Sequence, residues 1–160
     1  MEELYKEYSK IVYNYLLYFT NNTDIAEELM QETFYSAVKN INKFKNESCI
    51  KTWLCKIAKN KWIDYYNKTL KLKEVNIDNI NEKYLSINPI EEEFLNKEEL
   101  LDIYKRIHKL DEKSKEVVYL RIRASFSFKE IANIMEKTEA WARITFYRAK
   151  LKLMEESENG

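Results

Sequence analysis

Two stretches of this sequence combine cationic side chains with aromatic rings, a mixture typical of nucleic-acid interfaces. The first runs from residue 47 to 68, ESCIKTWLCKIAKNKWIDYYNK, and places two Trp and two Tyr among several Lys. Lysine amines neutralise phosphates, whereas flat rings can stack on unpaired bases. The second lies near the C-terminus, where Arg143, Tyr147, Arg148 and Lys150 fall on the outward face of a predicted helix. Such side chains could reach phosphates and base edges in a major groove.

Other chemistries find little support in the residue types. The only glycine is Gly160, so phosphate-cradling glycine loops and nucleophile elbows are absent. His108 is far in sequence from Cys49 and Cys55, whose spacing fits no zinc pattern. We expect these three residues to fill helical packing sites, with both thiols reduced. We expect no metal, no cofactor and no enzymatic activity, and the lack of a secretory leader or a long apolar stretch predicts a cytoplasmic protein.

The net charge of zero conceals blocks of opposite sign. Residues 39–73 carry ten Lys or Arg against two Asp or Glu, and residues 113–154 carry ten against four. The segments 1–38 and 74–112 are acidic. Because local potential decides whether a polyanion can dock, the two basic blocks indicate two contacts with nucleic acid. Two merely solvated helix faces are the alternative.

Helical periodicity dominates the first half of the chain. Apolar residues recur at helical spacing over 4–19 and again over 25–44, which predicts two long amphipathic helices. Between them Asp24, followed three residues later by Glu27, fits a capping arrangement that begins the second helix. A third helix is expected over 53–66, where both Trp residues fall on the inward stripe and should pack in the core.

The second half reads as a linker followed by shorter helices. Periodicity weakens from residue 71 to 96, a stretch rich in Asn and Asp or Glu, which predicts an acidic linker. Beyond two short helices, Ser127 and Glu130 form a capping box, and Thr138 can cap the last helix. Two helices joined by so short a turn suit a helix-turn-helix. The predicted fold is therefore all-α, with two small helical domains.

Three segments in this order resemble the extracytoplasmic-function (ECF) group of bacterial RNA polymerase sigma factors. They are DIAEELMQETFYSAVKNINKF, the basic aromatic stretch quoted above, and IANIMEKTEAWARITFYRAKLKL. The resemblance covers roughly Tyr5 to Leu70 and Glu98 to Met154. It implies sigma region 2 over residues 1–70, a linker over 71–96, and the helix-turn-helix of region 4 over 97–154.

The resemblance also implies site residues. Those matching the polymerase-binding helix are Ala26, Glu27, Leu29, Gln31, Glu32 and Phe34, of which Leu29 and Phe34 could equally be core. Those matching the part that contacts the opened −10 element are Lys45, Asn46, Glu47, Ser48, Lys51, Lys56, Lys59, Asn60 and Lys61. Those facing the −35 element are Arg143, Ile144, Thr145, Tyr147, Arg148 and Lys150.

At two places the sequence departs from the family pattern, and these departures limit which family properties can be assigned to it. Glu136 stands where the family usually has a glycine in the turn, so a left-handed residue there would carry a strain of about 1 kcal/mol. Ile144 and Thr145 replace a common Ser-Arg pair, so no base preference carries over. Trp141, near the start of the last helix, is expected in the core, with a contact to the DNA backbone as the alternative.

The partners implied are core RNA polymerase, promoter DNA and a cognate anti-sigma factor, possibly membrane-anchored. Either domain alone should bind DNA weakly, and polymerase would raise the effective concentration of both. Two other functions remain open at this point. A stand-alone helix-turn-helix regulator would bind symmetric DNA tightly by itself, and a protein-binding all-α adaptor would show no salt-sensitive affinity for DNA.

Overall fold

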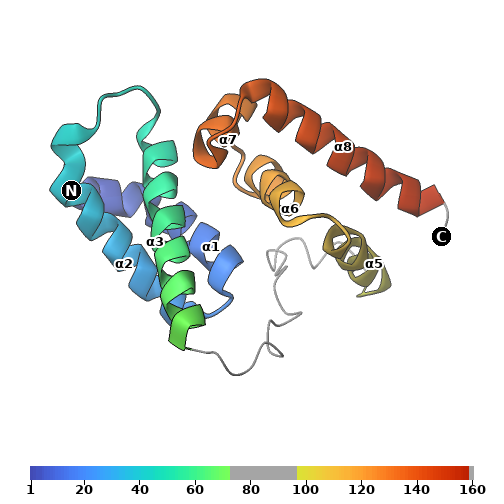
Figure 1. Cartoon of the computed structure of the whole chain (residues 1–160), viewed down its shortest axis with the longest axis horizontal. Helices are drawn as coiled ribbons and strands as arrows, with labels where there is room; N and C mark the ends of the chain where they lie inside the picture. Colours follow the sequence, from blue (N-terminus) through green and yellow to red (C-terminus); the bar gives the residue numbers. More distant parts are fainter. Residues whose placement is uncertain (73–96, 159–160) are drawn as a thin grey trace. The chain divides into compact units, whose positions relative to one another are not determined.

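The structure is a computed structural model that describes residues 1–72 and 97–158. Every regular element in those two ranges is a helix, which confirms the predicted all-α class. The helices form two compact units, α1 to α3 and α5 to α8 (Figure 1). The acidic linker expected over 71–96 lies outside the described residues from 73 onward, and residues 71 and 72 are the end of α3.

The first unit consists of α1 (Glu2–Thr20), α2 (Thr23–Asn40) and α3 (Ile50–Leu72). Each of these helices packs on the other two. Their shared core is apolar and consists of Val12, Tyr15, Leu16, Ala26, Leu29, Met30, Phe34, Ala37, Leu54, Cys55 and Ala58. Each large aliphatic side chain buried in this way contributes about 1.5–3 kcal/mol to folding, so the three helices stabilise one another. The two long amphipathic helices predicted for this region are confirmed.

The turn between α1 and α2 differs from the expected one. Asn21 takes the left-handed conformation at φ 52°, and the side chain of Asn22 accepts hydrogen bonds from the backbone of Asp24 and Ile25 at 3.0 and 3.1 Å. The prediction that Asp24 caps α2 is wrong because the helix already begins at Thr23. Asp24 lies in the first turn, where its negative charge still favours the helix dipole.

A short 3-10 helix, η1 (Ile41–Lys43), and a loop connect α2 to α3. Asn46 in this loop is left-handed at φ 56°. Cys49 precedes α3 and is exposed, so the expectation that it fills a helical packing site is wrong, whereas Cys55 is fully buried as expected. His108 is also exposed, because it is the last residue of its helix rather than part of a packed face.

The second unit consists of α5 (Lys97–His108), α6 (Glu112–Val118), a π-helical turn η2 (Tyr119–Arg123), α7 (Phe128–Met135) and α8 (Glu139–Glu158). Helix α8 packs on α5, α6 and α7. The Arg106 side chain ties α5 to α8 by donating to the backbone oxygen of Leu153 at 3.4 Å. The buried apolar residues include Val117, Leu120, Phe126, Phe128, Ile131, Ile134, Ala142 and Ala149.

The α7–α8 pair has the capping features predicted from the sequence. Ser127 and Glu130 form a reciprocal capping box, with Glu130 donating its backbone N–H to the Ser127 hydroxyl at 3.1 Å. Glu136 ends α7 in the left-handed conformation at φ 55°. The Thr138 hydroxyl accepts a hydrogen bond from the backbone of Trp141 at 3.0 Å, which caps α8. The helix-turn-helix geometry is therefore fixed locally at both helix starts and at the turn.

Candidate nucleic-acid interface

The cations of α3 do not share a single face. Lys61 reaches toward α2, where its Nζ lies 4.0 Å from a Glu32 carboxylate oxygen, and only 31% of its side chain is exposed. Lys56 and Lys59 are half-buried, and Asn60 is exposed. Lys56, Lys59 and Asn60 stand at i, i+3 and i+4 and therefore share one side of α3, whereas Lys61 lies apart from them and is partly neutralised by Glu32.

The aromatic residues of α3 contact other aromatic residues of the first unit. Trp62 stacks on Phe19 of α1, with ring centroids 5.9 Å apart, and its other ring neighbours are Tyr65 and Tyr66. Trp53 packs at 5.0 Å against Phe44, which follows η1. Neither Trp is fully buried, so the core packing expected for them is only partial. Both rings are half-buried at the edge of the core.

The loop before α3 presents polar groups to solvent. Lys45, Asn46 and Glu47 are exposed, while Ser48 and Lys51 are half-buried. Just beyond them, the Cys49 sulfur lies 3.0 Å from the hydroxyl of the buried Thr52. This contact anchors the end of the loop to the first turn of α3.

The six residues expected on the polymerase-binding helix divide into two groups. Glu27, Gln31 and Glu32 are exposed on α2. The other three are buried, namely Ala26, Leu29 and Phe34, and the Phe34 ring packs edge-on against Tyr5 at 5.0 Å. The alternative that Leu29 and Phe34 are core residues therefore applies. The exposed surface of α2 also includes Tyr35, 65% exposed with the Lys39 amine 5.1 Å from its ring centre, a feature that the sequence did not single out.

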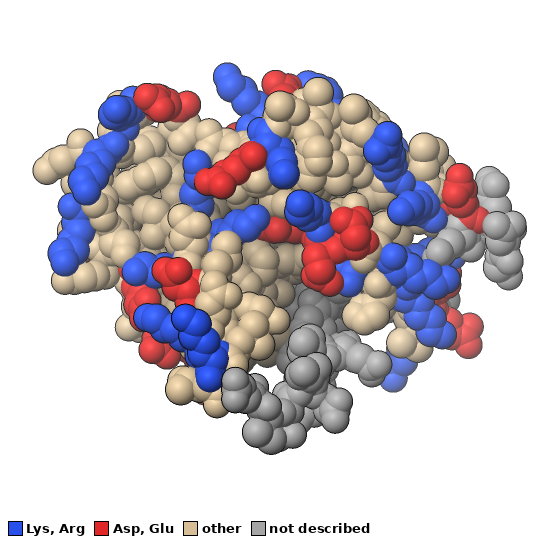
Figure 2. Space-filling view, viewed as in Figure 1, with Lys and Arg blue, Asp and Glu red and all other residues tan. Residues whose placement is uncertain are grey.

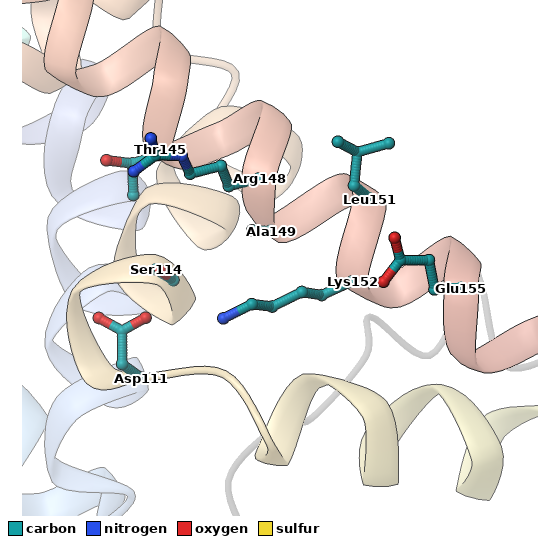
Figure 3. A pocket seen from close by; sticks show the side chains of 8 residues that line it. All are labelled: Asp111, Ser114, Thr145, Arg148, Ala149, Leu151, Lys152 and Glu155. Atoms are coloured by element: carbon teal, nitrogen blue, oxygen red, sulfur yellow. The ribbon is translucent and has the colours of Figure 1, made fainter.

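Helix α8 exposes five of the six residues expected to face DNA. These are Arg143, Ile144, Tyr147, Arg148 and Lys150. Thr145 is the exception, because it is half-buried and lines a cleft between α6 and α8 (Figure 3). Trp141 is half-buried, with the Lys137 amine 5.8 Å from its ring centre, so it is not a fully buried core residue.

Acidic and basic side chains both line the cleft between α6 and α8. Figure 3 shows the Lys152 side chain extending from α8 toward Asp111 and Ser114 at the start of α6. Hydrogen bonding from Ser114 and the positive charge of Lys152 together lower the pKa of the Asp111 carboxyl, against the opposing effect of its partial desolvation. Asp111 therefore stays ionised at neutral pH and partly compensates Lys152.

Two arginines share the ring of Phe128, an arrangement that the sequence analysis missed. The guanidinium carbon of Arg121 lies 4.2 Å from the ring centre and that of Arg143 lies 5.1 Å from it. Arg121 also donates to the backbone oxygen of Phe126 at 3.1 Å, and Arg143 pairs with Glu139 at 2.7 Å. The signal available in the sequence was that Arg121 belongs to the same basic block as α8, but only the π-helical turn brings it to α7.

Charge is interspersed across the surface. Figure 2 shows Lys and Arg at many points of the visible face, with Asp and Glu between them. Within residues 1–72 and 97–158, no cluster of three or more His, Cys, Asp or Glu is placed to hold a metal ion. None of the helices described there is both long and apolar enough to cross a bilayer.

Comparison with known proteins identifies similar chains. Residues 4–71 match the family described as Sigma-70 region 2. The chain is 31% identical to the RNA polymerase sigma factor YlaC of Bacillus subtilis, covering 96% of this chain and 89% of YlaC. It is 29% identical to the ECF RNA polymerase sigma factor SigM of the same organism, covering 96% and 92%.

Solved structures show the same fold. The sigma factor RpoE of Bartonella quintana, solved with the anti-sigma factor NepR, superposes with a TM-score of 0.72 at 22% identity over 96% of this chain and 94% of RpoE. CnrH, solved with the cytosolic domain of CnrY, superposes with a TM-score of 0.66 at 19% identity over 99% of this chain and 87% of CnrH.

Proposed function

This chain belongs to the ECF group of RNA polymerase sigma factors, and from that premise we propose how its two units share promoter recognition. As a sigma factor, it binds core RNA polymerase and directs promoter recognition, melting of the −10 element and transcription initiation. We assign region 2 to residues 1–70 and region 4 to residues 97–154. Residues 71–96 would then join two DNA contacts that act together.

In the first unit, the exposed side of α2 is the proposed contact with polymerase. Glu27, Gln31 and Glu32 supply polar and acidic groups there, and the exposed Tyr35 ring adds an apolar anchor. The buried Leu29 and Phe34 hold this surface from beneath. Acidic side chains on a small exposed patch favour a basic partner surface, mainly by accelerating association.

The loop 45–51 and the exposed side of α3 are the proposed −10 contact. Lys45 and Asn46 are exposed at the loop, and Lys56 and Asn60 follow along the helix. Their cations would neutralise backbone phosphates, which gives affinity without sequence readout. Because Trp53 and Trp62 are partly buried by ring contacts within the unit, only part of each ring is available to a base.

The observation that carries the −35 assignment is the α7–α8 pair. Its capping box, left-handed turn and Thr138 cap fix α8 against α7, and the outward side of α8 carries exposed cations. A recognition helix that is positioned in this way can enter a major groove with its N-terminal half. The Arg143 side chain, stacked on Phe128 and paired with Glu139, is restrained before DNA binds.

A cognate anti-sigma factor is a further proposed partner. Two similar folds were solved with a bound anti-sigma factor or cytosolic partner domain, NepR on RpoE and CnrY on CnrH. Such a partner would cover the same α2, α3 and α8 surfaces that polymerase and DNA use. Since core polymerase acts in the cytoplasm, we propose that location for this chain as well.

Run-off transcription tests the proposal. A library of genomic fragments would be transcribed by core RNA polymerase with and without the protein, at two salt concentrations. We expect discrete start sites that require the protein and weaken at the higher salt. No new start sites, together with tight and two-fold symmetric DNA binding by the protein alone, would instead favour a stand-alone helix-turn-helix regulator.

A further inference from the structure

Helix α8 carries an exposed apolar line of side chains. Ala140, Ile144, Tyr147 and Leu151 follow one another at spacings of four, three and four residues, so they form one ridge on the helix. Ile144, Tyr147 and Leu151 are 50%, 53% and 58% exposed. The buried Ala142 and Ala149 lie on the opposite side, against α6 and α7. The α8 ridge therefore faces away from α6, while its Tyr147 ring leans toward α7, 6.2 Å from the ring centre of Phe128.

Cations border the α8 ridge on both sides. Arg143 and Lys150, seven residues apart, lie on the side of α7, because Arg143 rests on the Phe128 ring. Arg148 and Lys152, four residues apart, lie on the side of α6, where both line the cleft with Asp111. In Figure 3 the Leu151 side chain points away from Lys152 and Asp111, which separates the ridge from this row.

Two cationic rows with an apolar line between them complement one kind of surface in particular. A major groove is bounded by two phosphate backbones, and the base edges on its floor expose one apolar group, the thymine methyl. The rows would face the two backbones while the α8 ridge faces the bases. A second copy of this chain would not match this pattern, because it would bring like charges together on both sides of the ridge.

The position of Arg143 indicates that the bases would be met by an apolar side chain. Arginine is the usual reader of guanine, through a bidentate contact with its major-groove edge. Arg143 is instead held on the side of α7, away from the centre of the ridge, by its ion pair with Glu139 at 2.7 Å and its contact with the Phe128 ring. The side chain left at the centre of the exposed ridge, in the N-terminal half of α8, is Ile144.

We propose that the α8 ridge reads thymine methyl groups in the −35 element, with Ile144 as the principal specificity-determining residue and the flanking cations holding the two phosphate backbones. This inference rests on the proposed function, because it assumes that α8 enters the −35 major groove. It replaces the guanine readout expected of an arginine-bearing helix with an A·T preference read through apolar contact. Tyr147 would contribute the next contact along the groove.

The experiment uses promoters obtained from the run-off assay. Each thymine upstream of the start site, on either strand, is replaced singly by deoxyuridine, which removes only the 5-methyl group. Transcription by core polymerase with the wild-type protein should fall about three- to five-fold at one or more −35 positions, as expected for loss of one buried methyl. Deoxyuridine placed between the two promoter elements controls for general effects of the base.

Matched variants identify the residue responsible. With Ile144→Ala, core polymerase should give almost equal transcript yields from templates carrying deoxyuridine or thymidine at the sensitive position, because the side chain that contacts the methyl group is gone. Ile122→Ala, the same change at a 61% exposed isoleucine outside α8, should keep the full thymidine preference. Thermal unfolding of both variants excludes a difference in folding.

Each other outcome has a distinct meaning. Normal run-off with no deoxyuridine effect at any −35 position would overturn the thymine readout while leaving the sigma factor function intact. Absence of any protein-dependent transcript would instead refute the proposed function. A dimer in solution that Ile144→Ala dissociates would assign the α8 ridge to a second copy of the chain and would also overturn the proposal.

Discussion

Glu136 is a strained residue at the turn of the helix-turn-helix, and replacing it should stabilise the second unit. Its backbone lies at φ 55° and ψ 44°. The N–H of the next residue, Lys137, donates to the backbone oxygen of Ala132 at 2.9 Å, which is the 6→1 hydrogen bond of a Schellman motif. A residue with a Cβ pays about 1–2 kcal/mol in this conformation. Glycine avoids that cost but loses about 0.5–1 kcal/mol more backbone entropy on folding than alanine does. The net expectation for Glu136→Gly is about 1 kcal/mol of added stability.

The assay is urea unfolding of the full chain, read by tryptophan fluorescence. Of the three Trp residues only Trp141 belongs to the second unit, so Trp53→Phe and Trp62→Phe leave a single reporter close to the turn. With a denaturant slope of about 1 kcal/mol/M for a unit of this size, Glu136→Gly should raise the unfolding midpoint by about 1 M. The substitution is made in the same background.

Glu136→Ala is the matched control, because it removes the charge and the longer side chain but keeps the Cβ. Its midpoint should stay within about 0.3 M of the parent, since the left-handed strain is unchanged. The reasoning fails if glycine raises the midpoint no more than alanine does. In that case the stability would come from loss of the exposed carboxylate and not from relief of the backbone.

Three further predictions concern the capping box, the α6–α8 cleft and the α2–α3 ion pair. Ser127→Ala should lower the stability of the second unit by about 1 kcal/mol in the same urea assay, because α7 loses its cap. The pKa of Asp111 is depressed in the folded state, chiefly by the hydrogen bond from Ser114. The ionised carboxylate therefore stabilises the fold above the unfolded pKa of about 3.9, and this stabilisation is lost as the pH falls through the lower folded pKa. The stability gap between the wild type and Asp111→Asn should therefore narrow in acid, as urea midpoints measured from pH 7 to pH 3 would show. Glu32→Gln should change stability by less than about 1 kcal/mol, because its contact with Lys61 is long and partly exposed, yet it should weaken core polymerase binding in a direct titration.

The sequence predicted the elements better than their ends. Long apolar periodicity identified α1, α2, α3 and the α7–α8 pair, because a helix that buries one face must repeat its apolar residues. The start of α2 was misassigned because Asn22 and Asp24 are both good N-caps, and the two possible helix starts differ by only two residues. The Ser127 box was predicted correctly because its two residues cap each other.

The candidate sites were less predictable, because they depend on how elements from distant parts of the sequence meet. Lys61 looked like another phosphate contact until packing brought it to Glu32 of α2. Cys49 was expected in a packing site because a free Cys behaves as a small hydrophobe, but it lies before α3 begins and is exposed. Arg121 gave no sign of meeting Phe128, since a π-helical turn cannot be read from the spacing of apolar residues.

The thymine readout has a consequence for how the two units must cooperate. Burial of one methyl is worth about 0.8 kcal/mol, or about four-fold in affinity, so even three such contacts discriminate only about sixty-fold. That ratio is far below what a genome of competing sites demands. The −10 contact of the first unit must therefore multiply it, and two weak contacts multiply only when both sites are engaged at once at a matched spacing. Core polymerase supplies that spacing, and a promoter whose two elements are moved apart should lose transcription even though each element is intact.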